Sequence, residues 1–225
     1  MFKKPKIEEF FAVGATTAES LRNDLIGLLE CFSGDETIIA ETCRQVISGY
    51  AEKHRAYHNL SHISALLRLA ESFRAQFEDL RSVRLAIWFH DAVYQPKSAS
   101  NETESAKLAV EKLSALNAPA ATIRRVERMI SATQRHDAAG LDADGRLFLD
   151  FDLSILGADA EIYRHYAAAI RREFSFVPWF LYRRSRRRIL ENFLRREHLY
   201  LTSQMREKYE AAARFNVENE IKALS

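Results

Sequence analysis

Two short stretches decide how this sequence is interpreted: residues 57–63 read Tyr-His-Asn-Leu-Ser-His-Ile, and residues 88–94 read Trp-Phe-His-Asp-Ala-Val-Tyr. Three histidines and an aspartate lie in these stretches beside apolar residues. His58 and His62 are four positions apart, so on a helix both would lie on one face. Imidazole nitrogens and a carboxylate together form a donor set that suits a divalent metal ion. The two stretches therefore predict a metal site.

The segments around these stretches have the spacing of amphipathic helices. Apolar residues recur at steps of three and four after His62, which places this histidine at the start of a buried helix face. A second apolar helix is predicted over residues 80–92, ending at His90 and Asp91. Buried polar side chains need a hydrogen bond or a metal ion. The alternative to a metal site is a set of hydrogen-bonded histidines that only brace the fold.

A further carboxylate ligand is expected in the apolar segment 147–157, which contains Asp150 and Asp152. On a helix these two side chains diverge by about 200°, so only one of them can point at a shared metal ion. The other would cap a helix or orient a histidine.

The composition favours helix throughout the chain. Of the 225 residues, 47% are hydrophobic, and only seven are Gly and four are Pro, so a sizeable core can be buried. We predict an all-α fold in a single domain over residues 1–225. Its core would span about 17–160, followed by a basic helical extension over about 161–225. Residues 1–16 are expected to form a poorly fixed leader before the first helix.

The charge and hydropathy of the chain argue against two classes of partner. The net charge of +2 gives no general reason to expect nucleic-acid binding, and apolar residues interrupt the arginines crowded between positions 183 and 196. No stretch approaches the roughly 18 uncharged apolar residues that span a bilayer. Two cysteines do not suggest a disulfide framework. We therefore expect a cytoplasmic protein that binds neither membranes nor nucleic acid.

The motifs resemble those of the HD superfamily of metal-dependent phosphohydrolases, and in particular a bacterial branch of predicted HD phosphohydrolases. The resemblance covers roughly residues 17–220. It is carried by Tyr-His-Asn-x-x-His at 57–62, His-Asp at 90–91 after an apolar run, Asn-Glu at 101–102, and Asp-x-Asp-Leu-x-Ile-Leu-Gly at 150–157. It implies an HD-domain-like helical bundle with a C-terminal helical extension. The implied metal ligands are His62, His90, Asp91 and Asp152. Asp152 is preferred to Asp150 because the last aspartate of the superfamily precedes an apolar helix in the same way.

The resemblance also implies a reaction. Metal-activated water would cleave a phosphate ester of a small molecule, with a nucleotide as the expected substrate class. The cofactor would be one divalent ion, either Mn²⁺, Mg²⁺, Fe²⁺, Co²⁺, Ni²⁺ or Zn²⁺. Tyr-His-Asn-x-x-His is also similar to a motif of cyclic-nucleotide phosphodiesterases, in which the first histidine is the acid and the second binds metal. This similarity implies that His58 is the general acid.

Four more residues receive roles, each with an alternative. Glu102 is a second candidate for the acid or for a base that orients water, but a carboxylate is favoured in a first helical turn in any case. Arg55, Lys97 and His136 are expected to contact the substrate. The alternatives are that Arg55 is a surface arginine, that Lys97 is a solvated loop lysine, and that His136 is an exposed histidine at a helix end. A second metal ion would be bridged by Asp91 and completed by His136 or Glu102. The alternative function is a metal- or nucleotide-binding HD module that acts as a sensor without turnover.

Overall fold

The computed structural model describes residues 15–224, and every regular element in this range is helical. Ten α-helices and two short 3₁₀ helices follow one another, with no strand in the described range. The predicted all-α fold is therefore confirmed. The expected leader lies outside the described residues except for its last two positions, which begin the first helix. No helix between residues 15 and 224 has both the length and the apolar character needed to cross a bilayer.

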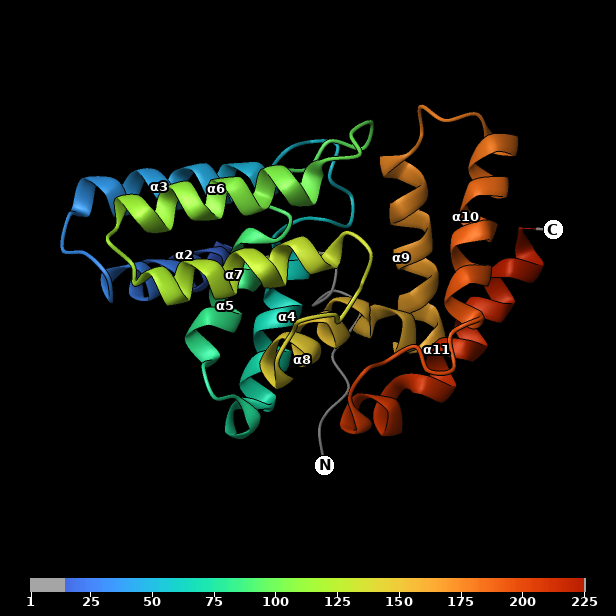
Figure 1. The fold of residues 1–225 in the computed structure, drawn as a ribbon. Coiled ribbons are helices and arrows are strands. Elements are labelled where there is room, and N and C mark those ends of the chain that lie inside the picture. The colour runs from blue at the N-terminus through green and yellow to red at the C-terminus, as the bar shows by residue number, and fades with distance from the viewer. Residues whose placement is uncertain (1–14, 225) are drawn as a thin grey trace.

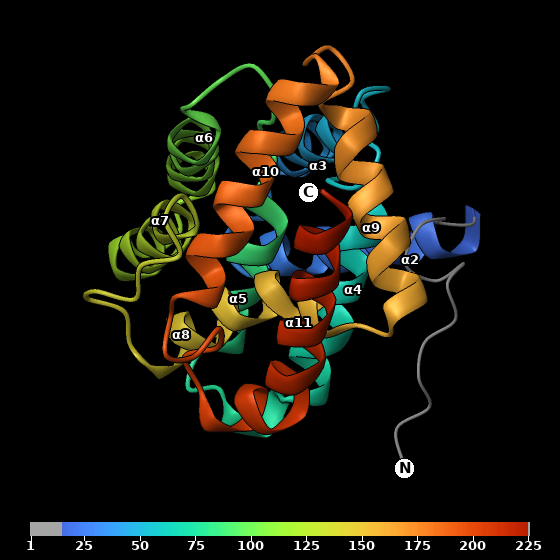
Figure 2. The same cartoon turned by 90° about the vertical axis from the view of Figure 1, so that its right-hand side faces the viewer.

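The helices fall into two groups that Figures 1 and 2 show from two sides. In Figure 1, α2 to α8 pack together and α9, α10 and α11 lie beside them. In Figure 2 the three C-terminal helices are in front, so they form a layer over one side of the first group. The bounds are α2 (Ala15–Glu30), α3 (Glu36–Tyr50), α4 (Leu60–Ser72), η1 (Arg74–Gln76), α5 (Leu80–Phe89), α6 (Asn101–Ala115), α7 (Ala120–Thr133), α8 (Ala143–Asp152), η2 (Leu153–Gly157), α9 (Ala160–Glu173), α10 (Trp179–Leu194) and α11 (Ser203–Ala223).

Polar side chains at the N-termini explain where several helices begin. Asp35 accepts hydrogen bonds from two first-turn amides of α3, and Asn59 accepts one from the Ser61 amide of α4. Each side chain satisfies a donor that has no partner within its own helix. Asn59 fixes the start of the helix that carries His62.

Asn101 begins α6 but is not its N-cap. Ser100 occupies the N-cap position, and Asn101 is the first residue of the helix. The Asn101 side chain accepts a hydrogen bond from the Gln95 amide at 2.9 Å and donates one to the Gln95 carbonyl at 3.0 Å. These two bonds close the loop 95–101 onto the start of α6.

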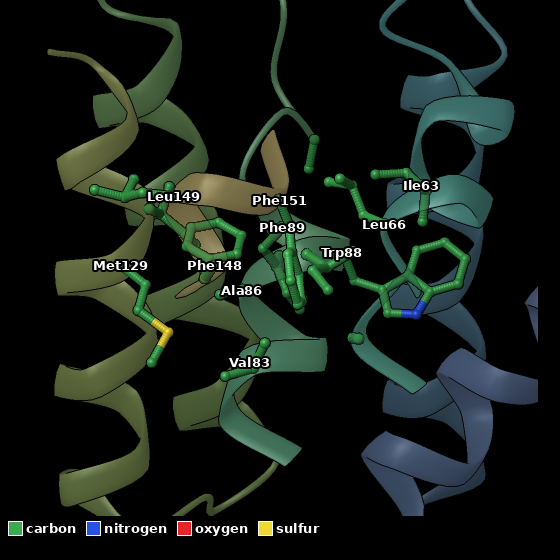
Figure 3. Close-up of a cluster of buried hydrophobic side chains, with 14 of the residues drawn as sticks. Ile63, Leu66, Val83, Ala86, Trp88, Phe89, Met129, Phe148, Leu149 and Phe151 are labelled. Carbon is green, nitrogen blue, oxygen red and sulfur yellow. The ribbon is translucent and has the colours of Figure 1, made fainter. Parts of the chain in front are cut away.

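The core that holds the predicted ligands is formed by α4, α5 and α8. Figure 3 shows Trp88 and Phe89 of α5 close to Leu66 of α4 and to Phe148 and Phe151 of α8. None of these five side chains is more than 1% exposed. Burial of a large apolar side chain contributes roughly 1.5–3 kcal/mol. The packing therefore fixes the three helices relative to one another, and with them the polar residues at their ends.

Candidate metal centre

The packing of α4, α5 and α8 brings three of the predicted ligands together. His62 lies in the first turn of α4, His90 directly follows α5, and Asp152 is the last residue of α8. One ligand atom from each of these residues lies within 4.8 Å of the others. The structure thus contains a His/His/Asp cluster that could hold a metal ion.

The distances within the cluster fit ligands that share one cation. His62 Nε2 lies 3.2 Å from His90 Nε2 and 3.4 Å from Asp152 Oδ1, and His90 Nε2 lies 3.7 Å from the same oxygen. Two donors that bind one ion at about 2.1 Å are separated by roughly 3.0–3.4 Å in octahedral or tetrahedral coordination. Nitrogen and oxygen donors at these distances suit several first-row divalent ions, and they select none of them.

Asp91 lies against the same cluster. Its Oδ2 is 3.1 Å from His90 Nε2 and 4.0 Å from His62 Nε2. The helix expected over residues 80–92 ends earlier, at Phe89, and His90 is its C-cap. His90 still has helical backbone angles, and Asp91 follows it in a turn.

His90 is held in one orientation by its own helix. Its Nδ1–H donates a hydrogen bond of 2.9 Å to the carbonyl of Ile87. This contact leaves Nε2 facing His62 and the carboxylates. An outer hydrogen bond of this kind fixes the tautomer of a ligand histidine and increases its basicity.

The carboxylates of the cluster perturb the titration of the histidines. Burial favours the neutral form of His90, but the charges of Asp91 and Asp152 outweigh burial and raise its pKa to about 9. Burial lowers the pKa of His62. The pKa of Asp152 is held well below its usual range, because hydrogen bonds from His136 and His62 outweigh burial. Two ionised carboxylates thus face two buried imidazoles, a charge arrangement that a divalent cation would balance in place of protons.

The side chains of Asp150 and Asp152 on α8 point in different directions, as predicted from their spacing on a helix. Asp150 is only 1% exposed and accepts hydrogen bonds from the amides of Leu201 and Thr202 at 2.6 and 2.8 Å. The Thr202 hydroxyl donates a third, at 2.6 Å. Asp150 therefore anchors the start of α11, and Asp152, the preferred candidate, is the one in the metal-ligand cluster.

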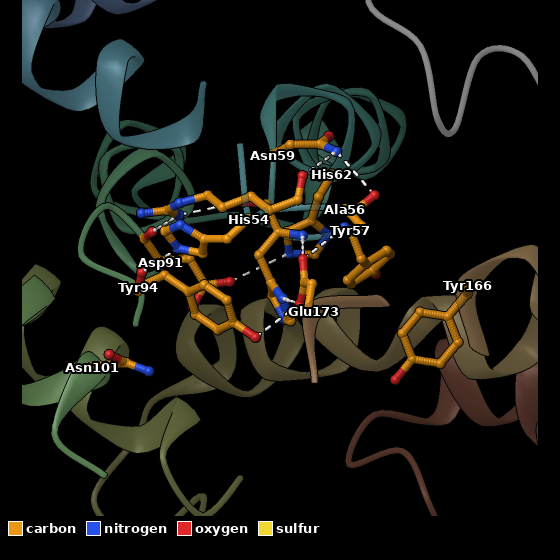
Figure 4. A network of polar contacts seen from close by, with 12 residues as sticks. His54, Ala56, Tyr57, Asn59, His62, Asp91, Tyr94, Asn101, Tyr166 and Glu173 are labelled. Carbon is orange, nitrogen blue, oxygen red and sulfur yellow. Dashed lines mark hydrogen bonds and ion pairs between the residues drawn. The ribbon is translucent and has the colours of Figure 1, made fainter. Parts of the chain in front are cut away.

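His58 is held by a carboxylate from the C-terminal layer of helices. Its Nδ1–H donates a 2.7 Å hydrogen bond to Oε2 of Glu173, the last residue of α9. The same oxygen accepts a 2.8 Å hydrogen bond from the Tyr94 hydroxyl, and Oε1 accepts from the amides of Tyr57 and His58 at 2.7 and 3.0 Å. Figure 4 shows this network beside His62 and Asp91. The carboxylate of Glu173 is fully enclosed, and four donors satisfy it.

The pairing of His58 with Glu173 shifts the pKa of both residues. Burial would raise the pKa of Glu173, but the hydrogen bond and the charge of His58 lower it to about 2. Burial would lower the pKa of His58, but the hydrogen bond to Glu173 and the nearby charge of Asp91 raise it above its ordinary value. His58 is thus stabilised in its protonated form.

Glu173 was not selected from the sequence, although a signal for it was present. It continues the buried face of α9 formed by Ile162, Tyr166 and Ile170 at helical spacing. A carboxylate on such a face needs a partner. That partner is 115 residues away in the chain, so the sequence alone did not connect the two.

Arg55 is buried, so the alternative of a surface arginine is wrong, while its expected contact with substrate stays a prediction. It is 5% exposed, and its guanidinium donates hydrogen bonds to the carbonyls of Asp91 and Ala92 at 2.6 and 3.1 Å and to Glu52 at 3.0 Å. Gly49 lets the same turn approach α3 closely, because a Cβ there would lie 2.6 Å from the Ala92 carbonyl oxygen. Arg55 therefore ties the loop before α4 to the His90–Asp91 turn, and we interpret it as a positioning residue.

The remaining predicted residues lie at different distances from the cluster. His136 follows α7 with a φ of 47°, and its Nε2–H donates a 3.0 Å hydrogen bond to Asp152 Oδ2. Glu102 lies in the first turn of α6, and no hydrogen bond or ion pair within residues 15–224 joins it to the cluster. Lys97 is exposed in the loop 95–101. The structure therefore places His136 at the cluster, while the roles of Glu102 and Lys97 stay predictions.

Comparisons with protein-family models, with curated proteins and with solved structures gave no match for this chain. The chemistry of the site is therefore inferred from its side chains and from the motifs that they form.

Proposed function

We propose that this chain is a metal-dependent phosphohydrolase of the HD type that cleaves a phosphate ester of a small molecule, with a nucleotide as the expected class. One observation carries the proposal: ligand atoms of His62, His90 and Asp152 converge within 4.8 Å, in the order of the His … His-Asp … Asp pattern. Asp91, at 3.1 Å from His90, supports the same pattern.

In this proposal the cluster binds the metal ion. A divalent cation held by His62, His90 and Asp152, with Asp91 beside it, would supply Lewis-acid activation of a phosphoryl oxygen and of water. The protein fixes these side chains through the hydrogen bonds of His90 to Ile87 and of His136 to Asp152. The two histidines are at most 3% exposed, which excludes bulk water from their side of the site.

His58 supplies the proton in this proposal. Its pKa is raised because Glu173 accepts the Nδ1–H hydrogen bond and nearby carboxylates stabilise the imidazolium. The Nε2–H of the charged ring then remains to protonate the leaving oxygen of the ester. The ring of His58 lies 6.1 Å from that of His62, centroid to centroid, which puts the acid next to a metal ligand.

The test is phosphate release from nucleoside mono-, di-, tri- and cyclic phosphates with each of the six divalent metals. Cyclic substrates need a coupled phosphatase so that ring opening registers. We expect metal-dependent turnover that His90→Ala abolishes. The matched control is His198→Ala. The His198 side chain is 42% exposed and belongs neither to the candidate metal ligands nor to the hydrogen-bond network of His58 and Glu173.

Metal content measured on the same samples separates the alternatives. No turnover with metal still bound to the wild-type protein would favour the sensor module over the enzyme. No bound metal in the wild-type protein would overturn the ligand assignment itself.

A further inference from the structure

A second group of polar residues surrounds a cavity of about 770 Å³ behind the Glu173–His58 pair. We call it the basic cavity. It is built by the loop between α3 and α4, the loop between α5 and α6, and the C-terminal end of α9 with the residues that follow it. Its lining includes Lys53, His54, Gln95, Lys97, Arg172 and Phe176. Its volume lies within the range of roughly 300–1,000 Å³ typical of small-molecule sites.

The basic cavity carries an excess of positive charge. Lys53, Lys97 and Arg172 come from three separate segments and line one space. None of the three forms an ion pair with a carboxylate in the described part of the chain. Glu173 is the acidic residue among the lining residues described, and its carboxylate is enclosed by its own four donors. The cavity therefore has a positive potential that attracts an anion.

Two of the three segments that carry these cations are held in place. Arg172 precedes Glu173, whose side chain is fixed by His58, Tyr57 and Tyr94. Lys97 lies in the loop that Asn101 closes onto α6. All three cations are exposed, so their donors are accessible to a ligand in the cavity. Lysine and arginine are also the residues whose donors match phosphate oxygens.

The rim of the basic cavity offers an aromatic surface. Phe176 is 47% exposed, and Lys97 Nζ lies 5.1 Å from the centroid of its ring. An exposed aromatic ring beside a cation can stack on a planar group while the cation reaches a phosphate. A second cavity, of about 740 Å³ on α10, also combines arginines with an exposed ring, that of Phe180, so arginines of that cavity provide the matched control.

We propose that the basic cavity is a binding site for a phosphorylated compound with a planar ring, such as a nucleotide. Its phosphates contact Lys53, Lys97 and Arg172, and its ring covers Phe176. The site shares a wall with Glu173 but uses none of the candidate metal ligands. Ligand binding there can therefore be measured with the metal removed. Lys97 is the one lining residue that was also expected to contact the substrate of the proposed hydrolase.

Isothermal titration calorimetry in the presence of EDTA tests the proposal. The probes are ATP, inorganic triphosphate and adenosine, and chelation removes the metal centre from the measurement. We expect ATP to bind most tightly, triphosphate more weakly and adenosine least. The triple variant K53Q/K97Q/R172Q should weaken ATP binding at least about tenfold, because it removes charge-assisted hydrogen bonds. Phe176→Ala should weaken ATP binding and leave triphosphate binding unchanged.

Matched variants control for charge and for loss of an exposed ring. The double variant R184Q/R188Q removes exposed arginines of α10, and Phe215→Ala removes a ring that is 60% exposed. Both should bind ATP like the wild-type protein. Circular dichroism checks that each variant is folded. The proposal is overturned if EDTA abolishes ATP binding, if the triple variant binds normally, or if R184Q/R188Q weakens binding as much as the triple variant does.

Discussion

Two carboxylates of the candidate site, the buried Glu173 and the partly buried Asp152, are satisfied in different ways. Glu173 receives four hydrogen bonds, from two amides, a tyrosine hydroxyl and His58. The partners of Asp152 among residues 15–224 are imidazoles, with His136 at 3.0 Å, His62 at 3.4 Å and His90 at 3.7 Å. The amide and hydroxyl donors around Glu173 cannot be exchanged for a cation, whereas imidazole nitrogens can lose a proton and bind one.

This difference indicates that Glu173 positions another side chain, whereas Asp152 is suited to bind a cation. The Glu173 region is complete within the protein and sets the orientation and charge of His58. The Asp152 region holds donors at distances that suit a shared cation. A carboxylate between histidines thus indicates an ion site, while a carboxylate among backbone amides indicates a structural anchor, as for Asp150.

The largest expected effect comes from breaking the Asp152 region. Asp152→Ala should lower metal affinity more than about 100-fold, since loss of even an outer partner of a metal ligand costs 10–100-fold. Metal titration followed by calorimetry measures the change. Asp150→Asn, two residues away, is the control: it should keep metal affinity but lower the free energy of unfolding by about 1–3 kcal/mol, because it weakens buried hydrogen bonds. Equal metal affinity in the two variants would contradict the assignment of Asp152 as a metal ligand and Asp150 as a structural anchor.

Breaking the Glu173 region should affect turnover and leave metal binding intact. Glu173→Gln should reduce kcat about 100-fold, the lower end of the contribution of a general acid. The pKa of His58 is raised by Glu173, and the acid is active only when protonated. Activity therefore falls as pH rises through the pKa of His58, and in Glu173→Gln this fall should move to lower pH. A pH–kcat profile with an unchanged alkaline limb would contradict the role of Glu173, and Glu173→Asp should restore part of the rate.

A moderate effect is expected where a histidine supports the Asp152 region. His136→Asn removes the hydrogen bond to Asp152 but tolerates the positive φ of 47° at this position. Metal affinity should fall about tenfold, as for other outer partners of metal ligands. Metal titration of His136→Asn beside His198→Asn gives the comparison. A loss as large as that of Asp152→Ala would make His136 a ligand in its own right.

The smallest effect concerns stability and pH. The pKa of Glu173 is lowered to about 2 from an ordinary 4.5, so its ionised form stabilises the fold above pH 4.5, and this stabilisation is lost as the pH falls towards 2. Wild type should exceed Glu173→Gln in the free energy of unfolding at pH 7, and the gap should narrow on acidification below pH 4.5. Urea unfolding at several pH values measures the gap. A gap independent of pH would mean that the charge of Glu173 adds nothing to stability.

The local parts of this picture could be predicted from the sequence. Periodicity predicted helices around His62 and His90, and the divergence of Asp150 and Asp152 meant that only one could face the cluster. The end of α5 at Phe89 was not predicted, because the apolar pattern continues to Ala92.

The missed parts depend on contacts between distant segments. Glu173 acquires its role only when α9 packs against the loop before α4, and Arg55 becomes a buried brace only when the Asp91 and Ala92 carbonyls meet it. The sequence placed Glu173 on a buried helix face and made Arg55 a candidate substrate contact, but it identified the partner of neither residue. Periodicity describes which face of an element is buried, but it does not say what that face meets.

The order of these residues along the chain has a consequence for synthesis. A ribosome makes a chain from its N-terminus, so His62, His90, Asp91 and Asp152 all emerge before Glu173. His58 is made first, and Glu173, whose carboxylate orients it, follows 115 residues later in the chain. During translation, the candidate metal ligands are therefore all made before the proposed proton donor gains its partner, and Glu173 is the last residue of the candidate site to be made.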